Sequence, residues 1–201
     1  MEKTYLQIPI PDSITRLGVA ILLAYRLNHY GFAFRLIPLT QGKFAIVDPE
    51  DFEELNKFKW FAKKHHNTFY AVRAIRENGK SRTVIMHRVV LQVPDGKFVD
   101  HKNRDGLDNR KANLRPATPA ENSWNRLVIH AKKRHSKYIG ITRQGRKFRV
   151  KITHNGICEN IGTFDNELDA AKAYDDAARK YHGEFAVLNF PNDSQIKTIA
   201  K

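Results

Sequence analysis

Residues 99–126, VDHKNRDGLDNRKANLRPATPAENSWNR, concentrate side chains whose types suit catalysis. One histidine, five asparagines and three aspartates occur within this short stretch. Because such polar side chains hydrogen-bond the backbone and weaken helices and strands, a simple loop has no need of so many. A neutral histidine can accept a proton from water near neutral pH. Carboxylate and amide oxygens can bind a hard cation such as magnesium, so we predict a divalent metal site.

The cysteine content limits the kind of metal site. Cys158 is the single cysteine of the sequence, which excludes an intramolecular disulfide and a cysteine-rich structural zinc site. The site must therefore use oxygen and nitrogen ligands. One free cysteine also fits a reducing environment, so we expect a cytoplasmic protein.

The charge of the chain is strongly positive and one-sided. The 201 residues carry a formal net charge of +14, and the pI is about 9.9. Residues 1–60 hold seven basic and seven acidic side chains, so the remaining 141 residues hold 28 basic and 14 acidic ones. Such a field suits a polyanion, and nucleic acid is the commonest polyanion that proteins bind.

An anionic membrane is the rival partner for a basic protein. The longest apolar run, residues 17–25, is much shorter than the about 20 residues that span a bilayer. No signal peptide is evident. We therefore expect double-stranded DNA, and not a membrane, as the partner.

The pattern of apolar and turn-forming residues predicts the elements that position the polar stretch. Residues 99–126 are typical of two short strands followed by a helix that begins at Pro119. Upstream, residues 35–86 predict short strands, with an acidic helix near residues 49–58. The pair Asn78-Gly79 between two alternating runs predicts a hairpin. These elements together predict a mixed α+β domain.

A further helix is predicted near the N-terminus. Asp12 is a suitable cap, and Gly31 a suitable end. Its apolar residues recur at roughly helical spacing, which predicts a contact with the core or with a partner. Nothing in this helix suggests chemistry.

The order of these elements and residues resembles the HNH endonucleases, in particular the homing endonucleases of phages and mobile elements. The resemblance extends upstream to about Ile37. It implies the ββα-metal fold, also called the His-Me finger. Four short motifs carry it: His87-Arg88, Asp100-His101, Asn113-Leu114-Arg115 and Glu121-Asn122.

The resemblance implies a role for each residue of these motifs. His101 is expected to act as the general base, and Asn113 as the catalytic brace that orients the loop around it. Asp100 and Asn122 are expected to bind the metal. The residues expected to support the site or to contact phosphate are His87, Arg88 and Arg115.

The residue types also bear on the identity of the metal. Many members of the family carry a histidine where this chain has Asn122. The homing branch is similar to this chain in using asparagine there. Carboxylate and amide oxygens favour hard ions, so Mg²⁺ or Mn²⁺ is expected rather than zinc. Such an ion would stabilise charge at the scissile phosphate and the leaving oxygen.

A second module is predicted after the polar stretch. Along residues 147–153, basic or polar side chains alternate with apolar ones, so one face of this strand is polar and the other apolar. A helix from about Asn166 to His182, stopped by Gly183, supplies small residues that can pack on the apolar face. We expect a three-stranded antiparallel sheet packed on one helix.

Residues 136–191 resemble the plant ethylene-response-factor, or Apetala-type, DNA-binding domain through the stretch IGTFDNELDAAKAYDDAARKYHGEFAVLNFP. The plant proteins mostly place arginine, tryptophan or glutamate at the positions that contact DNA, and this chain does not. Their base specificity therefore does not carry over. The residues expected to bind DNA, mainly at its backbone, are Arg143, Arg146, Lys147, Arg149, Lys151 and Thr153.

Three regions are thus predicted: an N-terminal helical extension (residues 1–34), an HNH nuclease domain (35–129) and a DNA-binding domain with a short tail (130–201). The resemblance implies a homing-type endonuclease of a phage-infected or bacterial cell. A DNA-binding regulator that retains the nuclease scaffold without cutting is the chief alternative, and an RNA-binding module a more remote one. The oligomeric state stays open, with the monomer slightly favoured.

Overall fold

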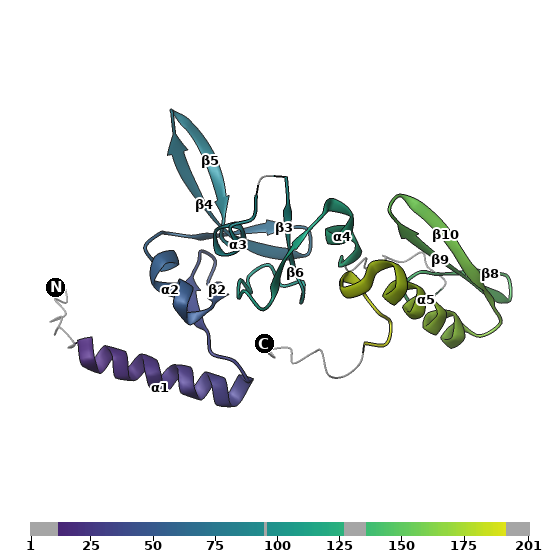
Figure 1. Ribbon diagram of the computed structural model, residues 1–201, viewed down its shortest axis with the longest axis horizontal. Coiled ribbons are helices and arrows are strands. Elements are labelled where there is room, and N and C mark those ends of the chain that lie inside the picture. The colour runs from purple at the N-terminus through teal and green to yellow at the C-terminus, as the bar shows by residue number, and fades with distance from the viewer. Residues whose placement is uncertain (1–11, 95, 127–135, 192–201) are drawn as a thin grey trace, which may run out of the picture.

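Two groups of helices and strands, each with its own core, make up the chain in the computed structural model, which describes residues 12–94, 96–126 and 136–191 (Figure 1). The N-terminal group contains α1 (Asp12–Tyr30), β1 (Arg35–Pro38), β2 (Phe44–Val47), α2 (Pro49–Asn56), β3 (Phe61–His65), β4 (Thr68–Glu77), β5 (Lys80–Ile85), α3 (Met86–Leu91), β6 (Phe98–His101), β7 (Leu114–Ala117) and α4 (Pro119–Trp124). The C-terminal group contains β8 (Ile141–Gln144), β9 (Lys147–His154), β10 (Ile157–Phe164), α5 (Glu167–His182) and the 3-10 turn η1 (Gly183–Phe185). The predicted boundary between residues 129 and 130 lies outside the described residues.

Three small antiparallel sheets build the N-terminal group. β1 pairs with β2, β4 lies between β3 and β5, and β6 pairs with β7. The β4–β5 hairpin turns at Asn78 and Gly79, whose φ angles of 50° and 74° suit an Asn-Gly turn. This hairpin projects from the body (Figure 1). The core of the group is formed by Ile37, Ala45, Val47, Phe52, Leu55, Trp60, Ala71 and Met86.

The elements that carry the polar stretch form a ββα unit. β6 and β7 are antiparallel, with Asp100 opposite Arg115 and His101 opposite Leu114. α4 follows directly, and Pro119 occupies its first turn, as expected. Its start is fixed by a capping box, in which the side chains of Thr118 and Glu121 bond each other's backbone amides. Glu121, part of a predicted motif, thus serves to begin the helix.

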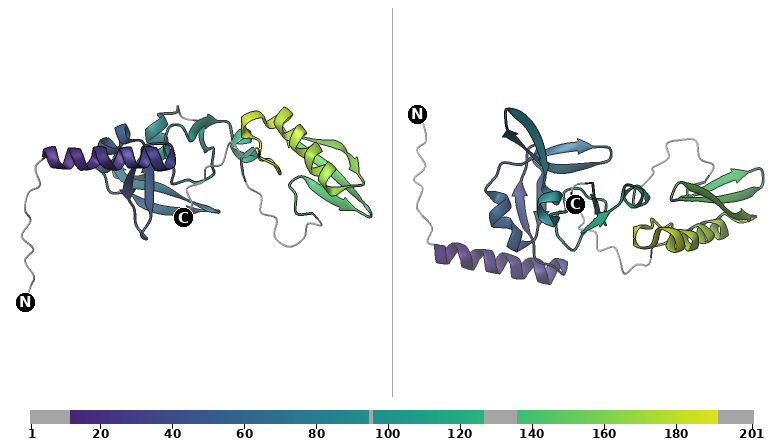
Figure 2. Two further views of the ribbon diagram at one scale, coloured as in Figure 1. Left: turned by 90° about the horizontal axis from the view of Figure 1, so that it is seen from below. Right: turned by 45° about the horizontal axis from the view of Figure 1, so that its top comes forward.

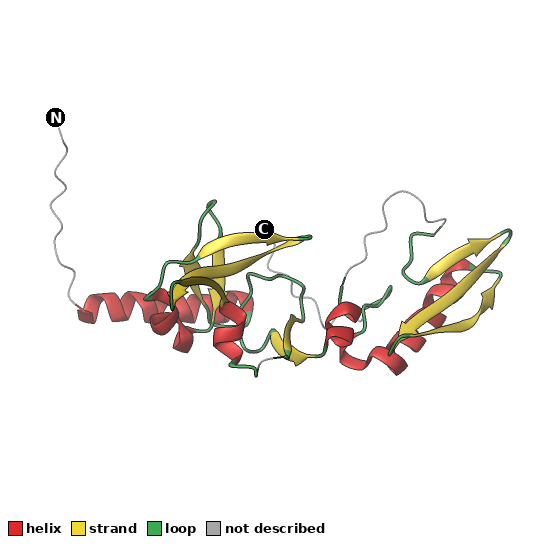
Figure 3. Cartoon of the chain, turned by 90° about the horizontal axis from the view of Figure 1, so that it is seen from above, coloured by secondary structure: helices red, strands yellow, loops and turns green. Residues whose placement is uncertain are grey.

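The C-terminal group has two layers, a sheet with strand order β10-β9-β8 and α5 along one face (Figure 3). Asn166 caps α5 by accepting a bond from the Leu168 amide, and Gly183 ends the helix with φ 54°. The core between the layers is formed by Ile141, Val150, Ile152, Ala170, Ala171, Tyr174, Ala177 and Ala178. Alanines on the helix allow it to lie close to the sheet.

The helix α1 does not pack into the core of the N-terminal group. It spans Asp12–Tyr30, and Gly31 follows with φ 80°, in agreement with the predicted ends. However, α1 has no buried residue, and several of its apolar side chains, including Ile14 and Leu17, are more than half exposed. Figure 2 shows α1 at the edge of the N-terminal group. Helical spacing predicts that a helix has an apolar face but not which part of the molecule packs against that face, so the spacing did not reveal that this face is exposed. No described helix is both long and apolar enough to cross a membrane.

Candidate active site

Two consecutive residues of the short strand β6 place a carboxylate and an imidazole in the interior. Asp100 is 5% exposed and His101 is 4% exposed. Adjacent residues of a strand point to opposite faces, so the two side chains face different neighbours. Asp100 faces β7 and the end of α4, whereas His101 faces β4 and α3.

The His101 imidazole is held among two rings and one amide. Its ring centroid lies 5.7 Å from that of Tyr70 and 5.0 Å from that of His87. Nε2 lies 3.4 Å from Oδ1 of Asn109. Burial lowers the pKa of His101, although the contact with Asn109 and the carboxylate of Asp100 oppose this effect. His101 is therefore neutral near pH 7, as a group that must accept a proton requires.

The loop between β6 and β7 is stabilised by its own polar side chains. Asn113 Oδ1 accepts a bond from the Asn103 amide, and Asn113 Nδ2 donates to Asn103 Oδ1 and to the Asp108 carbonyl. Asp108 in turn accepts two bonds from the Arg110 guanidinium, at 2.7 and 2.6 Å. Asn113 thus bonds the loop that carries Asn109, and its bracing role stays a prediction.

This loop is also anchored on the strands behind it. Backbone bonds join Leu107 and Asn109 to Ile46 in β2. The Gly106 amide donates to Thr68 Oγ1. A Cβ atom at Gly106 would lie 2.5 Å from the Phe69 carbonyl oxygen, so only glycine fits this approach without a shift.

His87 lies behind His101 and takes no direct part in the polar contacts of Asp100. It is 8% exposed, and its Nδ1 has no hydrogen-bond partner among the described residues. Burial, with smaller effects of His101 and Arg88, lowers the pKa of His87 to about 3. An uncharged His87 packs against His101 without adding a second charge to the site.

Arg115 and Asn125 converge on Asp100. Arg115 Nε and Nη2 lie 2.8 and 2.7 Å from Asp100 Oδ2. Asn125 Nδ2 donates to Oδ1 at 2.9 Å, to Oδ2 at 3.0 Å, and to the His101 carbonyl at 2.8 Å. Asn125 is 6% exposed. These contacts fix the orientation of the carboxylate.

Asn122, the other residue predicted to bind metal with Asp100, is placed differently. It lies within α4, and its side chain makes no hydrogen bond to the described residues. Asn125 follows α4 directly, three residues further on, and is the asparagine that reaches the carboxylate. Asn122 and Asn125 are asparagines of the same short segment, so their distance from Asp100 along the sequence does not show which of them contacts the carboxylate.

The donor set fits a hard divalent ion. Asp100 supplies a buried carboxylate, and the nearby Asn125 presents its amide nitrogen to it, so Asn125 could offer its oxygen only after the amide rotates. Mg²⁺ is commonly bound by one or two protein oxygens, with water and substrate phosphate completing its shell. Within the described ranges, no three His, Cys, Asp or Glu side chains gather where a metal could bind.

Comparison with known proteins agrees with this geometry. A family model described as HNH endonuclease matches residues 84–124, the segment that contains α3, β6, β7 and α4. A protein of Acanthamoeba polyphaga mimivirus named "Uncharacterized HNH endonuclease L560" is 29% identical over 157 residues, which cover 78% of this chain and 80% of that protein. The chain therefore contains an HNH endonuclease domain. It is thus a nuclease that cleaves DNA.

A second relative of this HNH endonuclease is "Protein 3.8" of Escherichia phage T7. It is 30% identical over 94 residues, which cover 47% of this chain and 77% of that protein. The family match ends at Trp124, one residue before the asparagine that touches the carboxylate.

The site of this HNH endonuclease also contains residues that were not predicted to belong to it. Asn109, in the polar loop between β6 and β7, contacts the His101 ring. Tyr70 comes from β4, more than 30 residues before His101, and packs against His87 and His101. Aromatic contacts of this kind leave no local signal in a sequence.

Arg88, which was predicted to support the site or to contact phosphate, bonds other groups here. Its guanidinium donates to the carbonyls of Pro94 and Lys97.

The residues predicted to bind DNA do not share one face of the C-terminal sheet. Lys147, Arg149, Lys151 and Thr153 alternate with the buried or half-buried Phe148, Val150 and Ile152 along β9. Arg143 instead pairs with Phe148 in register, and its Nε donates to the Gly145 carbonyl in the turn. Arg146 lies in that same turn, between β8 and β9.

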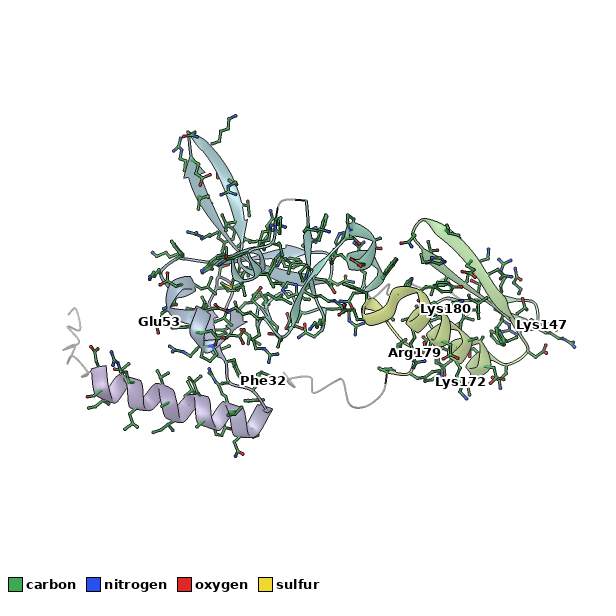
Figure 4. All side chains as sticks on the ribbon, viewed as in Figure 1. Phe32, Glu53, Lys147, Lys172, Arg179 and Lys180 are labelled. Atoms are coloured by element: carbon green, nitrogen blue, oxygen red, sulfur yellow. The ribbon has the colours of Figure 1, made fainter. Side chains whose placement is uncertain are left out.

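The outer face of the sheet is polar across all three strands. Lys151 lies opposite Asn160 and Thr153 opposite Cys158, which is exposed. The helix also carries basic groups: Lys172, Arg179 and Lys180 project from α5, and Lys147 projects from the sheet (Figure 4). Acidic groups accompany them, since Arg179 pairs with Asp176 on α5 and Lys147 pairs with Asp165.

Proposed function

We propose that the chain is a homing-type endonuclease that hydrolyses phosphodiester bonds in double-stranded DNA with Mg²⁺ or Mn²⁺, and that its C-terminal group positions the nuclease site on DNA. The observation that carries this proposal is the pair of consecutive residues Asp100 and His101, both of them buried, with the imidazole neutral and the carboxylate fixed by its hydrogen bonds. Metal-assisted hydrolysis requires a neutral base to accept a proton from water and an oxygen ligand to hold the metal, and these two residues can supply one of each.

Each residue has a defined part in this proposal. His101 accepts the proton of the attacking water, and Asn109 and Asn113 hold His101 and its loop in place. Asp100 would hold the metal, with the amide oxygen of Asn125 as a second ligand. When bound, the ion supplies positive charge at the scissile phosphate and at the leaving oxygen.

The C-terminal group supplies a function that the nuclease site lacks. A site that contacts mainly the DNA backbone selects sequence poorly. The outer face of β8–β10 presents basic and polar side chains, including Lys151 and Thr153, and a sheet of this kind can enter a major groove. A module that binds chosen sites would raise the residence of the nuclease there.

Incubation of the full chain with supercoiled and linear plasmid tests the proposal. We expect nicks or breaks with Mg²⁺ that disappear with EDTA and in His101→Ala. His29→Ala, an exposed histidine of α1, is the matched control and should cut normally. Mapping of the ends then tests whether cutting occurs at chosen sites. Tight, salt-sensitive binding by a chain that never cuts would instead support the regulator.

A further inference from the structure

The Arg115 side chain joins the nuclease site to the C-terminal group. Arg115 Nη1 donates to the Glu184 carbonyl at 2.6 Å, in the turn that follows α5. The Arg115 guanidinium carbon also lies 3.7 Å from the centroid of the Phe185 ring. The other edge of the same guanidinium binds Asp100. Arg115 therefore bridges the carboxylate of the site and the end of α5.

The contacts on the C-terminal side hold Arg115 in one orientation. A guanidinium is a rigid planar group, so a partner at one edge and a ring on its face determine where the other edge points. Arg115 is 8% exposed and Phe185 is 7% exposed, so water does not replace either contact easily. The Glu184 carboxylate, by contrast, is 69% exposed at 3.3 Å and adds little.

A second contact links the same turn to Asn125. The Trp124 and His182 rings are stacked, with centroids 4.6 Å apart and an interplanar angle of 12°. Figure 1 shows α4 beside this end of α5. Asn125 is the residue after Trp124, so the stack fixes the backbone from which Asn125 reaches Asp100.

His182 connects this junction to the sheet. Its Nε2 lies 2.9 Å from the carbonyl oxygen of Thr153, in β9. Lys151 and Thr153, which were predicted to bind DNA, belong to this strand. Thus contacts are continuous from the strand proposed to bind DNA to the two groups that orient Asp100.

We propose that the end of α5 is part of the nuclease site, with Phe185 and Trp124 as positioning residues that hold Arg115 and Asn125 against Asp100. The inference rests on the proposed role of Asp100 in binding the metal. It means that the nuclease elements alone do not fix the carboxylate, and that the site is complete only with the C-terminal group docked. A contact that merely packs the two groups together would change stability but leave metal affinity as it is.

Binding of Mn²⁺ to the full chain without DNA separates these two possibilities. Electron paramagnetic resonance of free Mn²⁺ gives the affinity for Trp124→Ala, Phe185→Ala and Phe185→Tyr, with circular dichroism to show that each variant is folded. We expect the two alanine variants to bind Mn²⁺ about tenfold more weakly, as for other groups that support metal ligands. Phe185→Tyr keeps the ring under Arg115 and should bind as the parent does.

Controls distinguish the junction from the rest of the module. Leu168→Ala truncates an exposed apolar residue in the first turn of α5, far along the helix from the junction, and should leave Mn²⁺ affinity unchanged. DNA affinity in EDTA should stay within about twofold for Trp124→Ala, because no proposed DNA contact is removed. Since Trp124 is only half-buried, this variant decides the matter even if Phe185→Ala does not fold.

The outcomes that would overturn the inference are distinct. Unchanged Mn²⁺ affinity in folded Trp124→Ala, with loss of affinity in Asp100→Ala, would overturn the positioning role alone. Unchanged affinity in Asp100→Ala would overturn the metal role of Asp100 and the inference together.

Discussion

The Asn125 amide nitrogen lies within hydrogen-bond distance of both carboxylate oxygens of Asp100, at 2.9 and 3.0 Å. Rotation of the amide about its last bond exchanges nitrogen for oxygen with little change of shape. With a metal bound at Asp100, this rotation would give up the three bonds of Asn125 Nδ2 and offer the amide oxygen as a second ligand.

Asn125→Ala should reduce DNA cleavage more than Asn122→Ala does. Loss of Asn125 removes a ligand and a support of Asp100, so we expect nicking at limiting Mg²⁺ to fall by about tenfold or more, with Asn122→Ala within about twofold of the parent. Nicking rates of plasmid across a Mg²⁺ series measure both. The reverse order of effects would restore Asn122 as the ligand.

Gly106→Ala should destabilise the fold and the site together. The added Cβ would lie 2.5 Å from the Phe69 carbonyl oxygen and 2.8 Å from the Tyr70 ring, which packs on His101. Overpacking of this kind costs about 1–3 kcal/mol. Urea unfolding gives the loss, and Gly18→Ala in α1, where nothing lies within 4 Å, is the matched control. Equal stability of Gly106→Ala and the parent would contradict the close approach.

Elements with local signals were predictable from the sequence. The β4–β5 hairpin follows from Asn78-Gly79, and the two ends of α5 follow from Asn166 and Gly183. Each signal acts within a few residues, because turns and caps depend on nearby backbone angles and side-chain bonds. The adjacency of Asp100 and His101 was equally visible, since it is a property of the chain itself.

Contacts set by tertiary structure were not predictable in this way. Whether Asn122 or Asn125 reaches Asp100 depends on how α4 sits against β6. The contact of Arg115 with Glu184 joins residues 69 positions apart and has no periodicity to reveal it. The exposed face of α1 illustrates the same limit, since a pattern shows that a face is apolar and not what it meets.

His87 should make the protein less stable as the pH falls below about 6.5. Its pKa is about 3 in the folded state and near 6.5 in an unfolded chain, so the unfolded state takes up the proton first. The stability is fully present above pH 6.5 and is lost as the pH falls toward about 3, by at most about 1.4 kcal/mol per pH unit.

Phenylalanine at position 87 cannot take up a proton on unfolding. His87→Phe should therefore reduce the dependence of the free energy of unfolding on pH. Between pH 6.5 and pH 5, the free energy of unfolding should change by up to about 2 kcal/mol less in His87→Phe than in the parent. Urea unfolding at several pH values measures it. The pKa of His101 and that of His182 are also lowered by burial, so part of the dependence should remain in the variant. His29→Phe, at an exposed position, should keep the slope of the parent, and a parental slope in His87→Phe would argue against a buried neutral His87.

Lys151→Ala should weaken DNA binding, whereas Lys172→Ala should not. Lys151 is exposed on the outer face of β9, and Lys172 is exposed on α5, which covers the opposite face of the sheet. If the sheet face contacts phosphates, loss of one lysine there reduces the slope of log affinity against log salt by about 0.9. Fluorescence anisotropy of labelled duplex DNA in EDTA, at several salt concentrations, measures affinity and slope without cleavage. Because the two substitutions remove the same charge, any effect of net charge alone appears equally in both. A loss confined to Lys172→Ala would place the DNA on the helix side, where Arg179 and Lys180 also project (Figure 4).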